Sequence, residues 1–286
     1  MADVITPALL RGWPLPEDAG SKDARGSVLV VGGARATPGA AMLAGLAALR
    51  VGAGRLTLGV AEAVATAVAV ATPEAGAVGL PETADGELDG AGVEGLDAEL
   101  ERARVLVVGP GLSAAAATAA LLEALLPRVG SGTAVVLDAF ALGVLRDVRE
   151  VVRPLGGRLV LTPNTSEGAR LLGLDDEDDP AAMAVRIAAE YDAVVTCRGA
   201  VADPDGGHWE ASTGSGGLAT SGSGDVLVGA VGGVLARGAT PAQAACWGTH
   251  LHGAAGDRLA ARVAAQGYLA RELLDELPAV LTELQA

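Results

Sequence analysis

Residues 220–231 read TSGSGDVLVGAV, a loop of small residues that leads directly into an apolar helical run. Glycines let the backbone approach a ligand closely, and the first amides of a helix have no partner within it, so a phosphate can bind there. Asp225 would stand beside that phosphate, where a carboxylate accepts the proton of an attacking hydroxyl. The alternative is an aspartate that only caps the helix after a flexible loop. Both interpretations fit these residues alone.

Outward from this stretch, short β-branched runs alternate with longer runs rich in Ala and Leu, a pattern typical of a parallel sheet with helices on its faces. The chain is 50% apolar but only 2% aromatic, so its core must be built from Ala, Val and Leu. We predict a mostly parallel α/β fold and one domain over residues 1–286. Helices are expected over residues 38–50 and about 114–126, and strands over residues 27–31, 55–58, 105–108, 134–137, 158–161 and 193–196.

Five of these strands end at a Gly, Pro, Asn or Asp turn, so the turns and the glycine loop are expected to meet in one crevice at the carboxyl edge of the sheet. Arg198 is a candidate phosphate contact there, because phosphates need positive charge in a chain of net charge −15. Asp138 either positions a metal or a ligand hydroxyl, or caps a turn. Glu167 fits a helix capping box around Asn164 or Thr165.

Charge and composition exclude several classes of function. A net charge of −15 argues against nucleic acid or an anionic membrane as a partner, and no apolar run reaches the length of about 18 residues that a membrane span needs. The isolated Cys197 and Cys246 form no metal motif, so a cytoplasmic location is the expectation. His250 and His252, two residues apart, cannot ligate one metal from a helix and are expected to pack or to line a substrate. No metal-ligating residues are predicted.

Residues 214–227, GSGGLATSGSGDVL, resemble the GNPGLATGGTGDVL signature of the ADP- or ATP-dependent NAD(P)H-hydrate dehydratases, members of the ribokinase-like superfamily. The glycine loop at residues 32–39 fits neither a Rossmann nor a Walker A pattern. Residues 21–22, 26–33 and 38–41, however, resemble the opening strand and helix of this family, and residues 47–54 continue the resemblance. The resemblance extends from about residue 9 to residue 259 and implies a three-layer ribokinase-like fold. Further matching segments, in the family's order, are residues 73–75, 108–112, 137–139, 161–164 and 252–257.

The resemblance also implies an activity. Hydrated NADH or NADPH carries a hydroxyl on its reduced nicotinamide ring, and these enzymes phosphorylate that hydroxyl and then eliminate phosphate. The implied cofactors are ADP or ATP as phosphoryl donor together with Mg²⁺, and Asp225 is implied as the catalytic base. The remaining implied contacts are Gly222, Ser223, Gly224, Arg198 and Gly199 for the nucleotide, and Ala40, Gly111, Asn164 and Asp225 for the substrate.

Three departures from the family pattern bear on the substrate. Asn164 stands where the family has a histidine, Phe140 replaces the second aspartate of its DAD motif, and Arg198 replaces the lysine of its KGA motif. One alternative is therefore a kinase that phosphorylates a small alcohol such as a vitamin precursor. Another is a nucleotide-binding regulator without catalysis.

Partners and flexible segments can also be anticipated from the sequence. We expect a homo-oligomer, and an epimerase for the hydrated cofactor on a separate chain, since 286 residues leave no room for a further domain. The acidic, less regular residues 81–98 are predicted to form a surface excursion or a small lid.

Overall fold

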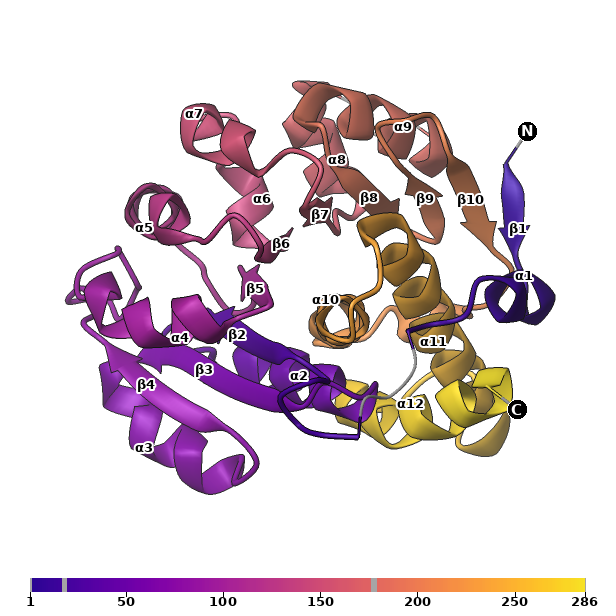
Figure 1. Ribbon diagram of the computed structural model, residues 1–286, viewed down its shortest axis with the longest axis horizontal. Helices are drawn as coiled ribbons and strands as arrows, with labels where there is room; N and C mark the ends of the chain where they lie inside the picture. The colour runs from indigo at the N-terminus through magenta and orange to yellow at the C-terminus, as the bar shows by residue number, and fades with distance from the viewer. Residues whose placement is uncertain (1, 17–19, 176–178, 286) are drawn as a thin grey trace.

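The computed structural model describes residues 2–16, 20–175 and 179–285 and has the predicted α/β architecture (Figure 1). Its described strands form one ten-stranded sheet. Strand pairs are antiparallel only where β9 meets its two neighbours, so the mostly parallel sheet is confirmed. In spatial order the strands are β1 (Asp3–Ile5), β10 (His208–Ala211), β9 (Ala200–Ala202), β8 (Val194–Cys197), β7 (Leu159–Leu161), β6 (Ala134–Leu137), β5 (Val105–Val108), β2 (Ser27–Val31), β3 (Arg55–Ala61) and β4 (Gly76–Leu80).

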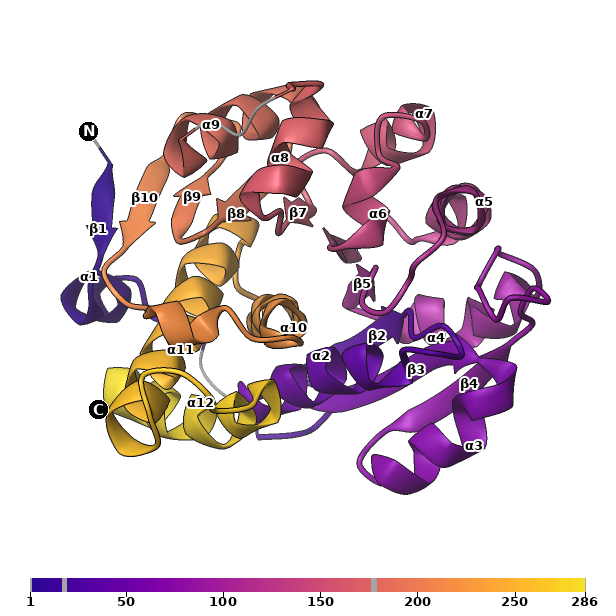
Figure 2. The same ribbon diagram turned by 180° about the vertical axis from the view of Figure 1, so that it is seen from behind.

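Helices cover both faces of this sheet, as Figures 1 and 2 show from opposite sides. One face carries α2 (Pro38–Arg50), α10 (Ser223–Ala236), α11 (Pro241–Arg262) and α12 (Ala270–Gln285). The other carries α4 (Asp97–Arg102), α5 (Ala115–Leu125), α6 (Phe140–Gly143), α7 (Arg149–Val152), α8 (Thr165–Leu172) and α9 (Pro180–Tyr191). None of the helices in the described ranges combines the length and apolarity needed to cross a membrane. The remaining helices are α1 (Pro7–Gly12), α3 (Glu62–Ala71), η1 (Val93–Leu96), η2 (Leu126–Arg128), η3 (Arg153–Leu155) and η4 (Gly216–Leu218).

The buried strands separate two hydrophobic cores. In β2, Val28 and Val30 face the core under α2 and α10, while Leu29 and Val31 face the core on the opposite side. Successive side chains of a strand point to opposite faces, so a strand buried on both sides must be apolar at every position. This requirement explains the continuous Val and Leu runs of the sequence.

Helices α2 and α10 approach each other closely through small residues. A Cβ on Gly229 would lie 2.0 Å from the carbonyl oxygen of Ala44, and a Cβ on Gly233 would lie 2.5 Å from that of Ala48. Both pairs are spaced four residues apart in the same direction, so the two helices run parallel. Their N-termini therefore lie at the same edge of the sheet, the carboxyl edge.

Gly229→Ala should lower the free energy of unfolding by about 1–3 kcal/mol, because the added methyl group would meet rigid backbone rather than a flexible side chain. The measurement is urea unfolding of both proteins. Gly143→Ala is the matched control, since no atom lies within 4 Å of the position its Cβ would take. Equal stability of the two variants would contradict the close packing of α2 on α10.

Candidate active site

The glycine loop delivers the chain to the start of α10, as predicted. Gly222 precedes the helix with a φ of +88°, a left-handed conformation that favours glycine. Within the first turn of the helix, the backbone amides of Gly224 and Asp225 have no hydrogen-bond acceptor among the described residues. A Cβ on Gly224 would meet nothing within 4 Å, so this side of the helix start is open. Two unpaired amides beside open space form a site suited to a phosphate.

Ser223 differs from its neighbours because its polar groups are engaged within the protein. Its amide donates to the carbonyl of Thr220, and its Oγ lies 2.9 Å from Nε2 of His252. Both side chains are buried, and burial lowers the pKa of His252 to about 4, so the imidazole is neutral. His252 thus holds the first turn of α10 in place. This contact was not predicted, because sequence alone does not show which helix packs on the loop.

Asp225 occupies the third position of α10 and is partly buried. Desolvation raises the pKa of its carboxyl to about 6. A carboxylate with this pKa is ionised at neutral pH and is still basic enough to accept a proton from a substrate. The open amide of Gly224 lies one residue before it, so a phosphate bound there would be within reach of Asp225.

Asp138 lies directly after β6 and is buried against Thr162, which follows β7. The Thr162 hydroxyl donates to Oδ1 of Asp138 at 2.6 Å. Burial raises the pKa of Asp138 to about 8, the Thr162 hydrogen bond opposes this shift, and the nearby carboxylates of Glu167 and Asp225 add to it. At neutral pH Asp138 is therefore largely protonated. Because the charges of Glu167 and Asp225 both affect the pKa of Asp138, the three carboxyl groups lie near one another.

Ala139, the next residue, has a φ of 50° and a ψ of −125°. This conformation is strained for a residue with a Cβ and costs about 1–3 kcal/mol. This strained residue makes the turn at the end of β6. It separates Asp138, which is buried, from Phe140, which is partly exposed. Among the described residues, no group of three or more His, Cys, Asp or Glu side chains is arranged to hold a metal ion.

The predicted capping box at the start of α8 is confirmed. Oδ1 of Asn164 accepts from the Glu167 amide at 2.8 Å, and the Glu167 carboxylate accepts from the Asn164 amide at 2.9 Å. The box uses the acceptor oxygen of Asn164 and leaves its side-chain NH₂ group available as a donor. Asn164 and Glu167 thus have structural roles at the crevice whether or not they touch a ligand.

The structure brings Ala40 and Gly111 together, although 71 positions separate them in the sequence. Gly111 has a φ of +73°, and a Cβ on it would lie 3.1 Å from the Cβ of Ala40. The loop before α2 is bonded to the loop after β5, since Thr37 Oγ1 donates to the Gly111 carbonyl at 2.7 Å. Ala40 and Gly111 therefore lie side by side at the carboxyl edge of the sheet, in a surface here called the Ala40–Gly111 wall.

Arg198 and Gly199 form the two-residue turn between β8 and β9. Their φ angles of +46° and +93° fit a type I′ hairpin turn, in which glycine is common and arginine is not. The turn lies at the carboxyl edge, and the Arg198 side chain is exposed, with no ion pair to any described residue. A short chain of contacts joins this hairpin to α10: Thr196 Oγ1 lies 2.8 Å from Thr249 Oγ1, and one turn later on α11 His252 contacts Ser223.

Two hollows differ in their suitability for a nucleotide. One, of about 300 Å³, lies beside the loop that leads to α10 and is lined by Ser212, Thr213, His250 and Asp257 among others. Nδ1 of the buried His250 has no hydrogen-bond partner among the described residues. This first hollow lies between α1, α11 and α12, and its lining includes the first two residues after β10.

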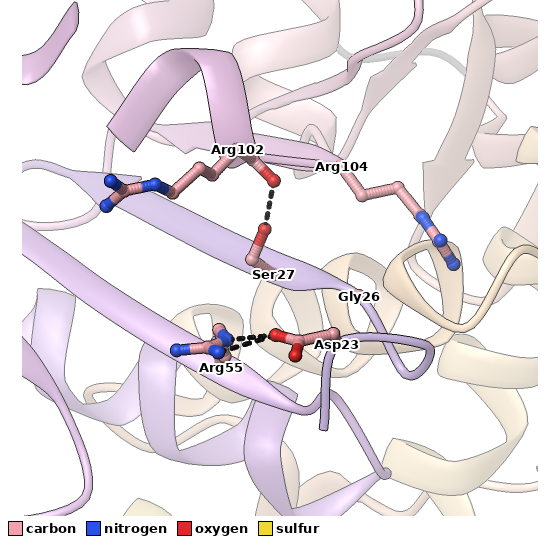
Figure 3. Close-up of a pocket in the computed structure, with 6 residues that line it drawn as sticks. All are labelled: Asp23, Gly26, Ser27, Arg55, Arg102 and Arg104. Carbon is pink, nitrogen blue, oxygen red and sulfur yellow. Dashed lines mark hydrogen bonds and ion pairs between the residues drawn. The ribbon is translucent and has the colours of Figure 1, made fainter. Parts of the chain in front are cut away.

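Another hollow, of about 420 Å³, lies at the opposite edge, around the amino ends of β2, β3 and β5 (Figure 3). Its arginines are already engaged and do not converge. Arg55 pairs with Asp23 at 2.6 Å, and Arg104 donates to the carbonyls of Ala24 and Ala236. Arg102 points away from Arg104 in Figure 3. This second hollow is remote from the carboxyl-edge crevice.

The chain is similar to known proteins over most of its length. The sequence profile of the NAD(P)H-hydrate dehydratase family matches residues 28–279. The chain belongs to this family. A dehydratase relative from Xanthomonas campestris, named ADP-dependent (S)-NAD(P)H-hydrate dehydratase, is 43% identical over 98% of this chain and 96% of its own length.

Solved structures extend the comparison to three dimensions. The ADP/ATP-dependent NAD(P)H-hydrate dehydratase from Bacillus subtilis, co-crystallized with ATP/Mg²⁺, superposes with a TM-score of 0.79 at 30% identity and covers 99% of both chains. A ribokinase-like superfamily protein from Enterococcus faecalis has a TM-score of 0.86 at 23% identity and covers 99% of this chain and 96% of its own. The ribokinase-like fold of this dehydratase family member is thereby confirmed.

Asp138→Asn should stabilise the protein increasingly as pH rises. The folded protein holds a proton on Asp138 up to a pKa of about 8, whereas the unfolded chain loses it near 3.8, so the aspartate destabilises the fold between these values. The advantage of the asparagine variant should grow by up to about 1.4 kcal/mol per pH unit in this window. Urea unfolding at pH 5 and pH 8 measures it. The exposed Asp147→Asn controls for the lost charge, and an advantage that shrinks with pH would contradict the buried, protonated carboxyl.

Proposed function

We propose that this chain restores NADH and NADPH from their hydrated forms, using ADP or ATP to phosphorylate the ring hydroxyl before phosphate is eliminated. The observation that carries the proposal is Asp225, whose carboxyl has a raised pKa beside the open amides of α10. Membership of the dehydratase family supports the same reaction. The named activities of its relatives support a phosphoryl donor rather than hydride transfer or simple hydrolysis.

In the first half of the proposed reaction, Asp225 accepts the hydroxyl proton of the substrate. The hydroxyl oxygen then forms a bond to the terminal phosphorus of the nucleotide, and the bond from that phosphorus to the nucleotide's bridging oxygen breaks. The amides of Gly224 and Asp225 bind the transferred phosphoryl group, whose negative charge they stabilise. AMP is released when ADP is the donor, and ADP is released when ATP is the donor.

In the second half, the bond between the ring carbon and the phosphate oxygen breaks and phosphate leaves with the electron pair. A proton passes from the neighbouring ring carbon to water, and the electrons of the broken C–H bond form the ring double bond of NADH or NADPH. The proton held by Asp225 is available to the departing phosphate. Asp138, largely protonated at neutral pH, adds no second negative charge beside the phosphate.

The nucleotide would extend from the start of α10 toward the hairpin turn. Arg198 and Gly199 lie at the same edge and would contact its phosphates or ribose, and the hollow of about 300 Å³ with its unpaired His250 Nδ1 would accept the base. No protein cage for a metal exists among the described residues, so Mg²⁺ would enter bound to the nucleotide phosphates and water. Ala40, Gly111 and the side-chain NH₂ of Asn164 would contact the hydrated dinucleotide.

The named relative acts on the (S) form of the hydrate. A stereospecific pocket leaves the other epimer unrepaired, which supports our proposal that an epimerase on a separate chain works with this enzyme. We also propose that the chain forms a homo-oligomer.

Asp225→Asn should reduce kcat by roughly 10²–10⁴-fold, because amide nitrogen cannot accept the hydroxyl proton. Binding of ADP should survive, since the backbone amides of α10 are unchanged. In the unmodified enzyme, kcat/KM should fall about tenfold per pH unit below the Asp225 pKa of about 6. The absorbance of reduced nicotinamide, followed at a series of pH values, measures the kcat of the variant and the pH dependence of kcat/KM. The exposed Asp205→Asn is the control, and near-normal turnover by Asp225→Asn would refute the base assignment.

The same assay separates the dehydratase from a kinase. A dehydratase restores the absorbance of reduced nicotinamide and releases inorganic phosphate, whereas a kinase of a small alcohol accumulates a phosphate ester. We expect stoichiometric phosphate release from hydrated NADH or NADPH with either donor. A stable phosphate ester with a vitamin-like alcohol, and no turnover of the hydrates, would favour the kinase.

A further inference from the structure

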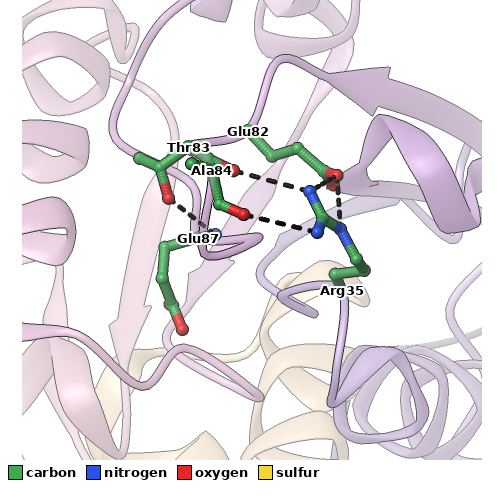
Figure 4. Close-up of polar contacts among 5 residues, drawn as sticks. All are labelled: Arg35, Glu82, Thr83, Ala84 and Glu87. Atoms are coloured by element: carbon green, nitrogen blue, oxygen red, sulfur yellow. Dashed lines mark hydrogen bonds and ion pairs between the residues drawn. The ribbon is translucent and has the colours of Figure 1, made fainter.

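Residues 81–90, here called the strap, follow β4 and lie against Arg35 of the loop before α2 (Figure 4). The strap is folded on itself rather than extended. The Thr83 amide donates to the Glu87 carbonyl at 2.9 Å, and the Glu87 amide donates to Thr83 Oγ1 at 3.1 Å. Leu88 anchors it in the hydrophobic core with 1% of its side chain exposed. The predicted surface excursion therefore has a fixed conformation of its own.

A first latch joins the strap to the loop before α2. Nε and Nη2 of Arg35 lie 2.7 Å and 2.5 Å from Oε1 of Glu82, and the Arg35 amide donates to the Gly86 carbonyl at 2.9 Å. The Glu82 side chain is only 11% exposed, so the pair is shielded from solvent on one side. A Cβ on Gly86 would lie 2.6 Å from the Cβ of Arg35, which shows how closely the two backbones approach. Figure 4 shows the Arg35 guanidinium turned toward residues 82–84.

A second latch joins the strap to the loop after β5. The Glu87 carboxylate accepts hydrogen bonds from the Ser113 amide, at 3.3 Å, and from the Ser113 hydroxyl. Ser113 lies two residues after Gly111, the predicted substrate contact. The strap is thus bonded to both loops that form the Ala40–Gly111 wall.

The two loops are also bonded directly to each other. Gly33 donates to the Pro110 carbonyl at 2.8 Å and Ala34 donates to the Gly111 carbonyl at 3.0 Å. Neither Ala40 nor Gly111 carries a side chain that could adapt to a ligand, so their contacts depend on where the backbone lies. Displacing such a contact by about 1 Å can cost up to 100-fold in activity.

We propose that the strap, latched by Arg35–Glu82 and Glu87–Ser113, is a fixed wall that positions the Ala40–Gly111 surface for the hydrated dinucleotide. Arg35 and Glu87 are positioning residues for this substrate. They lie on the substrate side and touch neither α10 nor the hairpin turn at Arg198, so nucleotide binding should not depend on them. This inference rests on the proposed function and assigns a role to residues that the reaction itself does not use.

The test compares Arg35→Gln and Glu87→Gln with the unmodified enzyme. Each variant should raise KM for the hydrated dinucleotide at least fivefold, while KM for ADP and kcat change less than twofold. Arg35→Lys keeps the positive charge and should recover part of the loss. Arg50→Gln is the matched control, because it removes an exposed arginine that pairs with Asp275 at 2.9 Å at the other end of α2.

Product binding provides a second measurement that does not need turnover. The dissociation constant of NADPH, read from its intrinsic fluorescence, should rise in both strap variants and stay unchanged in Arg50→Gln. Unchanged KM and NADPH affinity in variants with normal thermal stability would overturn the proposal. Equal losses toward ADP and the dinucleotide, in step with lost stability, would also overturn it, because they would mean a general structural role.

The experiments distinguish failure of the proposed function from failure of the strap proposal. If the unmodified enzyme does not convert the hydrates, the proposed function fails, and the NADPH affinities of the variants still decide the strap. If it converts them and the variants behave as the control does, only the strap proposal fails.

Discussion

The site depends on the close parallel contact of α2 and α10. Gly229 and Gly233 lie against the backbone of Ala44 and Ala48, so no side chain separates the two helices. This contact places both helix starts at the carboxyl edge of the sheet, one carrying Asp225 and the other carrying Ala40. Glycine inside a helix costs about 1 kcal/mol relative to alanine, and here the close approach offsets that cost.

Charge is the second constraint, because the proposed reaction would bring a nucleotide and a dinucleotide to one edge of a chain whose net charge is −15. Backbone amides at the start of α10 and the guanidinium of Arg198 supply local positive potential without changing the overall balance. Of the two acidic side chains with raised pKa values here, Asp138 contributes little opposing charge at neutral pH, whereas Asp225 is ionised and can act as a base. Asp138 is largely protonated at neutral pH, with a pKa of about 8, and Asp225 has a pKa of about 6, near the value that suits a base.

Much of the architecture could be predicted from local patterns. The expected strand over residues 27–31 and helix over residues 38–50 match β2 and α2 in their bounds, and the Asn164–Glu167 capping box formed as expected. Each of these features depends on residues that are close together in the sequence, so the sequence alone predicts it. The short edge strands β1 and β4 were not predicted, because Asp3–Ile5 and Gly76–Leu80 lack a sustained apolar alternation and are strands only through their pairing.

The sequence by itself determined the α/β class, the glycine loop before α10 and the candidate base Asp225, because these follow from periodicity and from the chemistry of adjacent residues. Tertiary structure alone decided that His252 holds Ser223, that Gly111 meets Ala40, and that Arg35 is latched to the strap. These contacts join residues 29 to 71 positions apart. Such pairings depend on helix packing and strand order, which no local pattern specifies. The raised pKa values of Asp138 and Asp225 have the same origin, since burial is a property of the folded protein.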